Sequence, residues 1–322
     1  MTANNPEKCI TSIGGQALIE GILMRGPHRI EVAVRTPEGK IDSEELQYVP
    51  IWDRWPVFRL PLLRGVASFA DSLCMSSRAL DMSSEKSGMT DIEGEEEENE
   101  SKLDQWIDKH LGDKAAKVFM VIGSVLGVAL AIALFFLVPT ALFNLLLHVT
   151  GSGLAGWRSP FEGVLRLIIF VAYIGLLGFQ PDVKRMFRYH GAEHKTIFCY
   201  EAGLPLTVDN VRRQGRFHPR CGTSFMVLMI LIGILVGLFI PFSNPFLRTF
   251  VKLLCIPIVV GLGYELIRYC GRHENRLTRI IAAPGLWMQR LTVKEPDDGM
   301  MEVAIAAMKK VIPANGEDRI AA

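Results

Sequence analysis

The sequence predicts an α-helical integral membrane protein with about four transmembrane helices and a small β-containing N-terminal cytoplasmic unit. Three observations predict this class. Apolar residues gather in the second half of the chain, in runs about as long as a bilayer crossing requires. Lysine and arginine gather in the segments between alternate runs. The N-terminal third instead shows the alternating apolar pattern of β-strands.

Four apolar runs make up the predicted membrane domain, residues 118–267. They are Val118–Val149, Phe161–Gln180, Ser224–Ile240 and Phe250–Ile267. The first exceeds the roughly 20 residues that cross a bilayer, with Pro139 marking a kink or its exit from the hydrocarbon. Pro257 lies inside the fourth run, and membrane helices tolerate proline better than soluble ones do.

The basic residues predict the orientation of these spans. The loop 181–223 carries eight lysine and arginine residues, and the segment after the fourth span carries several more. The other two connections contain only Arg158 and Arg248. Because positive residues stay on the cytoplasmic side, we expect loop 181–223 and both termini to face the cytoplasm.

The segments outside the membrane domain differ in character. Residues 1–82 predict a cytoplasmic or interfacial unit, in which Gly14–Lys40 forms extended segments with a turn at Pro37–Gly39. Within this unit, Phe58–Leu80 predicts an amphipathic helix at the membrane interface, with a re-entrant membrane segment as the alternative.

The remaining two segments complete the predicted organisation. Residues 83–117 predict a disordered acidic linker and the approach to the membrane, since such a charge block repels itself. Residues 268–322 predict a cytoplasmic tail, whose apolar residues at helical spacing could cover the cytoplasmic unit or bind a partner.

Composition limits the classes of partner. The net charge is +1, and a phosphate-binding surface needs a basic excess, so we expect no nucleic-acid partner. The six cysteines form no CxxC pair and predict no disulfide scaffold.

The loop between the second and third spans contains the pattern most typical of catalysis. Pro181 and Asp182 suit a helix start and Gly203 its end. One face of this predicted helix carries His190, Glu193, His194, Ile197 and Glu201.

Histidines four residues apart on a helix can hold one transition metal. The H-x-x-E-H order resembles that of the inverzincin metalloproteases. By that resemblance His190 and His194 would be ligands and Glu193 the general base. For the distal glutamate ligand of that family, Glu201 or Glu265 could substitute.

His218 and Cys221 follow in the same loop and complete a candidate four-ligand set with His190 and His194. The expected cofactor is a divalent transition metal, with zinc as the first candidate. Four protein ligands predict a closed, structural site. Three leave a position for water and make Glu193 catalytic. Interface histidines and a buried thiol without metal are the other interpretation.

Three further residues are accessory candidates. Glu20 and Arg25 could form an ion pair across a hairpin or face a site. Glu265, at the inner end of the fourth span, is a functional candidate because ionisable groups in spans are expensive, although it could pair with Arg268.

Four motifs resemble the YqhQ-like family of bacterial multi-pass membrane proteins. They are GGQALIEGILMRG, YHGAEHKTIFCYE, LTVDNVRRQGRFHPRCGTSF and PGLWMQRLTVKEPDDGMMEVAIAAM, which span nearly the whole chain. The resemblance implies a bacterial cytoplasmic membrane location and a metal-dependent enzyme whose substrate is not established. His190, Glu193, His194, His218 and Cys221 all lie in these motifs.

These observations lead to one functional hypothesis and one alternative. The hypothesis is a membrane-embedded metal-dependent hydrolase acting at the cytoplasmic face on a peptide or lipid-linked substrate. The alternative is a non-enzymatic scaffold or assembly factor, with a structural metal site or none, that binds a membrane-associated protein or peptide. A transporter ranks last, because the spans contain few central charges and no paired broken helices.

Overall fold

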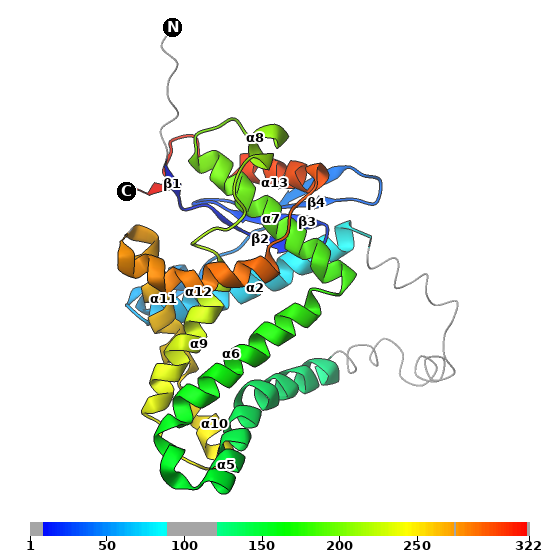
Figure 1. Cartoon of the computed structure of the whole chain (residues 1–322). Coiled ribbons are helices and arrows are strands. Elements are labelled where there is room, and N and C mark those ends of the chain that lie inside the picture. Colours follow the sequence, from blue (N-terminus) through cyan, green and yellow to red (C-terminus); the bar gives the residue numbers. More distant parts are fainter. Residues whose placement is uncertain (1–8, 89–120, 274, 321–322) are drawn as a thin grey trace, which may run out of the picture. The chain divides into compact units, whose positions relative to one another are not determined.

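The computed structural model describes residues 9–88, 121–273 and 275–320, most of which lie in helices (Figure 1). The chain forms two compact units. The first comprises Met1–Met89, Tyr173–Met229 and Pro257–Ala322, and the second Thr90–Ala172 and Ile230–Ile256. The coarse prediction of a mainly helical protein with a small N-terminal β region is therefore confirmed.

The N-terminal segment forms a four-stranded antiparallel sheet in the order β2-β3-β4-β5. Its strands are β2 (Gly14–Leu18), β3 (Gly21–Arg25), β4 (Ile30–Arg35) and β5 (Ile41–Glu45). The predicted turn at Pro37–Gly39 joins the last two, and Gly39 has the positive φ of 79° that glycine adopts without strain. A second pair, β1 (Ile10–Thr11) with β6 (Arg319–Ile320), joins the two ends of the described chain.

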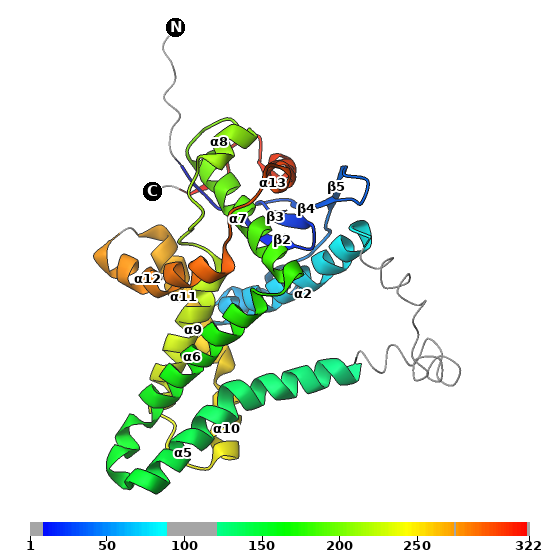
Figure 2. The same ribbon diagram turned by 45° about the vertical axis from the view of Figure 1, so that its right-hand side comes forward.

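Helices cover both faces of this sheet (Figures 1 and 2). On one face lies α2 (Leu63–Lys86), whose Met75 and Ala79 pack on the apolar side chains of the strands. On the other face lie α13 (Asp298–Val311) and α7 (Pro181–Glu201). The core on that side includes Ile22, Met24, Ala33, Ala192, Met300, Ala304 and Met308. The C-terminal tail thus covers the sheet, one of the two roles expected for it.

Helix α2 corrects two sequence-based boundaries. The predicted amphipathic helix at Phe58–Leu80 begins at Leu63, and it continues to Lys86, into the first residues of the predicted acidic linker. Residues 89–117 of that linker lie outside the described residues. The buried stripe of α2 is Gly65, Ala67, Asp71, Met75, Ala79 and Ser83. Since these residues recur about every four positions, one face of α2 packs on the sheet along its length.

Among the described residues, two helices are long and apolar enough to cross a membrane. They are Val121–Thr150 and Gly153–Leu177, of 30 and 25 residues. The first includes a π-helical turn, η3 (Ala133–Leu137), and α5 (Val138–Thr150); the second includes η4 (Ser152–Trp157) and α6 (Arg158–Leu177). Both coincide with predicted spans, and they indicate association with a membrane.

The third and fourth predicted spans are less regular. The third is α9 (Gly222–Leu238), which is apolar but only 17 residues long. The fourth is divided at Cys255 into α10 (Pro245–Leu254) and α11 (Ile256–Arg272), which bend by 47° and could count together as one span. Pro257 has no backbone N–H to continue the hydrogen-bond ladder of α10. By length and composition, two helices, or three spans if the bent pair counts as one, could cross a membrane among the described residues, so the predicted count of four is not confirmed.

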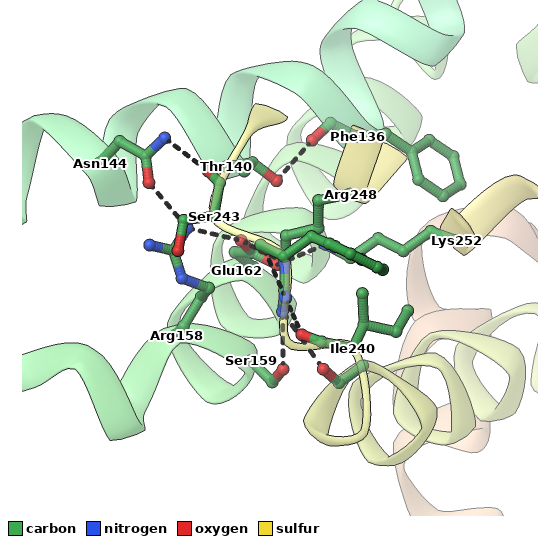
Figure 3. Close-up of polar contacts among 12 residues, drawn as sticks. Phe136, Thr140, Asn144, Arg158, Ser159, Glu162, Ile240, Ser243, Arg248 and Lys252 are labelled. Carbon is green, nitrogen blue, oxygen red and sulfur yellow. Dashed lines mark hydrogen bonds and ion pairs between the residues drawn. The ribbon is translucent and has the colours of Figure 1, made fainter. Parts of the chain in front are cut away.

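The second unit contains a buried group of charged side chains where α6 meets α10 (Figure 3). Arg248 Nε donates to both carboxylate oxygens of Glu162 at 3.1 Å, and Lys252 pairs with the same carboxylate. Each of Glu162 and Arg248 is only 1% exposed. The Arg248 guanidinium also donates to Ser159 Oγ and to the carbonyl oxygen of Gly237, at the end of α9. Arg248, which the sequence places in a turn between spans, thus joins α10 to α6 and α9.

Replacing Glu162 by glutamine tests this junction. Glu162→Gln leaves Arg248 and Lys252 buried without their counter-ion, a change that destabilises proteins by about 3–5 kcal/mol. We expect a markedly lower thermal unfolding midpoint of the detergent-purified protein. The control is Glu302→Gln, which removes a pair between Arg35 and a 52% exposed carboxylate and is expected to have little effect. Equal midpoints for the two variants would contradict the assigned role.

Candidate metal centre

Two histidines of α7 and one cysteine come together in the first unit. One potential ligand atom from each of His190, His194 and Cys221 lies within 4.8 Å of the others. The imidazoles lie one helical turn apart, with ring centroids separated by 4.4 Å. Cys221 immediately precedes α9, and its Sγ lies 3.1 Å from His190 Nε2.

Hydrogen bonds to the backbone fix the tautomer of both histidines. His190 Nδ1 lies 3.0 Å from the carbonyl oxygen of Thr292, and His194 Nδ1 lies 2.6 Å from that of Arg216. Because a carbonyl oxygen only accepts, each Nδ1 must carry the hydrogen, and each Nε2 keeps a lone pair. This outer hydrogen bond is the usual support of a metal-binding histidine.

The acceptor for His190 is held in place by close packing on α7. At Gly191 a Cβ atom would lie 2.0 Å from the carbonyl oxygen of Lys294, so only glycine permits this approach. The backbone N–H of Lys294 also donates to the carbonyl oxygen of Phe187 at 2.8 Å. The chain that leaves α12 (Arg276–Thr292) therefore runs directly along α7, with the Thr292 carbonyl group beside His190.

Ion pairs hold the same chain to the loop that supplies the second acceptor. Glu295 pairs with Lys195 of α7 and, at 2.9 Å, with Arg216. Burial works against ionisation of Glu295, but the hydrogen bonds from Lys195 and Arg216 outweigh it and lower its pKa. The segment after α12 and the loop before Cys221 are thus joined through one carboxylate.

The donor set fits a transition metal. Zinc binds imidazole nitrogen at about 2.0–2.1 Å and thiolate sulfur at about 2.3 Å, which places tetrahedral ligands roughly 3.3–3.8 Å apart. Neighbours within 4.8 Å can reach this spacing by small rotations of their side chains. Two nitrogens and one sulfur leave the fourth tetrahedral position for water or a substrate.

Glu193 lies beside this group but outside the set of three donors. Its side chain is 5% exposed and points toward the edge strand β2, where a Cβ atom at Gly15 would lie 2.8 Å from its Cγ. Burial raises the pKa of Glu193, while nearby His190 and the backbone N–H of Gly15 oppose the shift. A carboxyl group of this kind takes up a proton more readily than an exposed glutamate.

The structure gives His218 a different set of contacts from the other predicted ligands. Its Nε2 lies 3.6 Å from Glu201, and its Nδ1 accepts from the backbone N–H of Arg220 at 3.3 Å. Burial lowers the pKa of His218, although Glu201 opposes this. Glu201 pairs with Arg220 and accepts from the backbone N–H of Thr11 at 2.9 Å. His218 and Glu201 thus stabilise the loop that leads to Cys221, and neither belongs to the three-donor group.

The accessory candidates lie elsewhere in the first unit. Glu20 pairs with Arg185 of α7 and accepts from Tyr189 at 3.1 Å, so the proposed hairpin pair with Arg25 does not form. Arg25 instead lies over the ring of Trp52, 5.8 Å from its centroid. Glu265 accepts from Arg64 of α2 at 2.6 Å, whereas the sequence suggested Arg268 as its partner.

One supporting residue was absent from the sequence-based set. Gln289 of α12 is fully buried, accepts from the backbone N–H of His218 at 2.8 Å and donates to its carbonyl oxygen at 2.6 Å. It therefore fixes the backbone three residues before Cys221. In the sequence, Gln289 is one polar residue within the amphipathic segment 284–292, and no motif there indicates its supporting role.

Comparisons with known proteins identify one family and one relative, and neither has an assigned function. The family described as "Protein of unknown function (DUF1385)" matches residues 60–314. The chain is also 35% identical over 300 residues to the uncharacterized protein YqhQ of Bacillus subtilis (strain 168), covering 93% of this chain and 92% of that protein. No solved structure is significantly similar.

The three-donor group makes a direct prediction about metal content. We expect a transition metal near one equivalent in the purified wild-type protein and background levels in His190→Ala, His194→Ala and Cys221→Ala, measured by elemental analysis. His28→Ala, on an exposed side chain, is the control and should retain the metal. His218→Ala separates three ligands from four: it should keep the metal if His218 acts only through Glu201. A folded wild-type protein that remains metal-free after reconstitution would contradict the site.

Gly191 provides a second test. Gly191→Ala should displace the Lys294 carbonyl group and with it the acceptor of His190, and loss of such outer hydrogen bonds costs about 10–100-fold in metal affinity. Gly175→Ala is the matched control, since Gly175 also lies within a helix, outside the site, and a Cβ atom there meets nothing within 4 Å. Competition with a chromophoric chelator measures both variants, and equal affinities would show that the packing at Gly191 does not support the ligands.

Proposed function

We propose that this chain, which belongs to the YqhQ-like family of proteins of unknown function (DUF1385), is a membrane-embedded metal-dependent hydrolase. The observation that carries the proposal is the three-donor group of His190, His194 and Cys221, with both histidine tautomers set for metal binding. A site with three protein ligands keeps a position for water, as catalytic zinc sites do.

The proposed chemistry is hydrolysis at the cytoplasmic face of a bacterial cytoplasmic membrane. Zinc or a similar metal, held by His190, His194 and Cys221, would supply Lewis-acid chemistry and activate a water molecule there. Glu193 receives the proton of the attacking water, the role that its place between the two histidines suggests. The substrate is a peptide or a lipid-linked molecule, because a cytoplasmic loop between two membrane spans meets such molecules at the membrane surface.

The proposed topology has four crossings. It counts α9 and the bent pair α10–α11 as spans, beside the two longer helices. The basic loop 181–223, which holds the metal centre, and both termini then lie in the cytoplasm. Because the ligands come from this loop and from the start of α9, the site would open close to the inner membrane surface.

The alternative is a non-enzymatic scaffold or assembly factor with a structural metal or none. The dense packing of α13 and α7 on the sheet favours it, because much of the first unit is a rigid platform. Under this alternative the bound metal has no exchangeable position, and Glu193 has only a packing role.

Cobalt substitution distinguishes the two functions without a known substrate. The visible spectrum of the Co²⁺-loaded wild-type protein should show a thiolate band that disappears in Cys221→Ala. It should also shift when azide or acetohydroxamate is added, since an open position accepts these ligands. A spectrum that changes with neither azide nor acetohydroxamate would indicate a closed structural site and contradict the hydrolase proposal.

Glu193→Gln tests the proposed general base. We expect it to keep the metal but to reduce product formation from a peptide library, measured by mass spectrometry, by about 10²–10⁴-fold, the usual contribution of general acid–base catalysis. Glu302→Gln, on an exposed carboxylate, is the control and should be fully active. Equal product formation by wild type and Glu193→Gln would contradict the role of Glu193.

A further inference from the structure

A cleft of about 400 Å³ lies between the start of the chain's first helical segment and α11. This segment consists of α1 (Ile51–Arg54) and η1 (Pro56–Arg59), which precede α2. Aromatic side chains form part of the walls: Trp52, Phe58 and Tyr264. Three guanidinium groups also line the cleft, from Arg59, Arg64 and Arg268.

The charge of this cleft favours an anion. Asp53 pairs with Arg59 at 3.0 Å, and Glu265 pairs with Arg64. Arg268 has no hydrogen-bonding or ion-pair partner within the described part of the chain. Three arginines against two carboxylates leave a net charge of +1, which suits one phosphodiester. Arginine is well suited to such a ligand because its planar fork binds phosphate through two hydrogen bonds.

The segment that borders the cleft has an unusually apolar exposed surface. Trp55 is 64% exposed and Leu60 55% exposed, and Val57, Leu62 and Leu63 are also exposed. Arginines at positions 54 and 59 lie in the same stretch. Exposed aromatic and aliphatic side chains interleaved with arginine are typical of a segment that lies in the headgroup region of a bilayer.

Close backbone contacts fix this segment to α11. A Cβ atom at Gly261 would lie 2.9 Å from the carbonyl oxygen of Leu62, and one at Gly65 would lie 2.7 Å from Cβ of Tyr264. Leu62 itself has a positive φ of 67°, a strained conformation for a leucine. Since α11 is the second half of the bent pair that could cross the membrane, the apolar segment is held beside a candidate span.

Helix α12 gives an independent indication of a lipid surface. Its buried residues are Thr278, Gly285, Met288, Gln289 and Thr292, of which three are polar. Its exposed residues include the large apolar side chains of Leu277, Ile280 and Trp287, which a helix facing only water seldom exposes together. An exposed face of this composition, with Arg276 and Arg279 beside it, is stable against the apolar edge of a bilayer.

From these observations we propose that the cleft between η1 and α11 binds the phosphate of an anionic phospholipid headgroup. Arg268, with Arg59 and Arg64, provides the hydrogen-bond donors, and the exposed residues of the Trp55–Leu63 segment lie among the upper parts of the acyl chains. This site is separate from the metal centre and depends only on membrane association. It assigns the Trp55–Leu63 segment, which includes the start of Phe58–Leu80, to the membrane interface and not to a re-entrant crossing.

The test uses the full-length protein, purified in detergent and stripped of bound lipid. Trp106, Trp157 and Trp287 are replaced by phenylalanine in this otherwise wild-type protein and in every variant of it, so that only Trp52 and Trp55 fluoresce. Brominated phosphatidylglycerol or brominated phosphatidylcholine is titrated in, and quenching of the remaining fluorescence reports the arrival of acyl chains near these two residues. Both lipids carry the phosphodiester, but the choline ammonium of phosphatidylcholine cancels its charge and is repelled by the arginines of the cleft. We therefore expect the protein with an intact cleft to bind phosphatidylglycerol at least about tenfold more tightly. Arg268→Gln should abolish this preference.

Two controls complete the experiment. Arg213→Gln removes an exposed arginine that lies neither in the cleft nor on α12 and should keep the preference for phosphatidylglycerol. Arg59→Gln, at an exposed position, should weaken binding even if Arg268→Gln fails to fold, and folding of every variant is checked by its thermal midpoint. Equal binding of the two lipids by the wild-type protein would overturn the proposal. Inorganic phosphate that blocks lipid binding at low millimolar concentration would assign the cleft to free phosphate instead.

Discussion

The close approach of the backbone at Lys294 to α7 at Gly191 is the constraint on which the metal centre depends. It leaves no room for a side chain at Gly191, because a Cβ atom there would lie 2.0 Å from the Lys294 carbonyl oxygen. The approach brings the Thr292 carbonyl group to His190 and Glu295 to Lys195 and Arg216. The tautomer of His190 therefore follows from how one extended segment packs on one helix, and Glu295 ties the loop that supplies the acceptor of His194 to the same segment.

The two units satisfy their polar groups in different surroundings. In the first, the buried Glu193 and Gln289 are satisfied largely by backbone groups, as in a water-soluble core. In the second, Glu162 is buried among apolar helices and is satisfied by Arg248 and Lys252 (Figure 3). Burying these charges costs free energy, and removing one partner would cost more, because the other charges would then be buried without a counter-ion. The contacts of Glu162 with Arg248 and Lys252 therefore fix α10 against α6.

Much of the architecture follows from local patterns. The alternating residues of Gly14–Lys40, the long apolar runs and the helix start at Pro181 each depend on neighbours in the sequence, and each matches an observed element. The spacing of His190 and His194 also predicts their proximity, because one helical turn brings them together. Span boundaries were less accurate, since the break at Cys255 and the length of α9 depend on proline positions and packing.

The sequence by itself thus determined the helical membrane class, the small sheet and the histidine pair of α7, because periodicity and helix geometry act over a few residues. Only the tertiary structure decided that Cys221 joins this pair while His218 turns to Glu201. It also decided that Glu20 pairs with Arg185 and Glu265 with Arg64, both far away in the sequence. Partners separated by many residues are selected by the packing of whole elements, which leaves no local pattern in the chain.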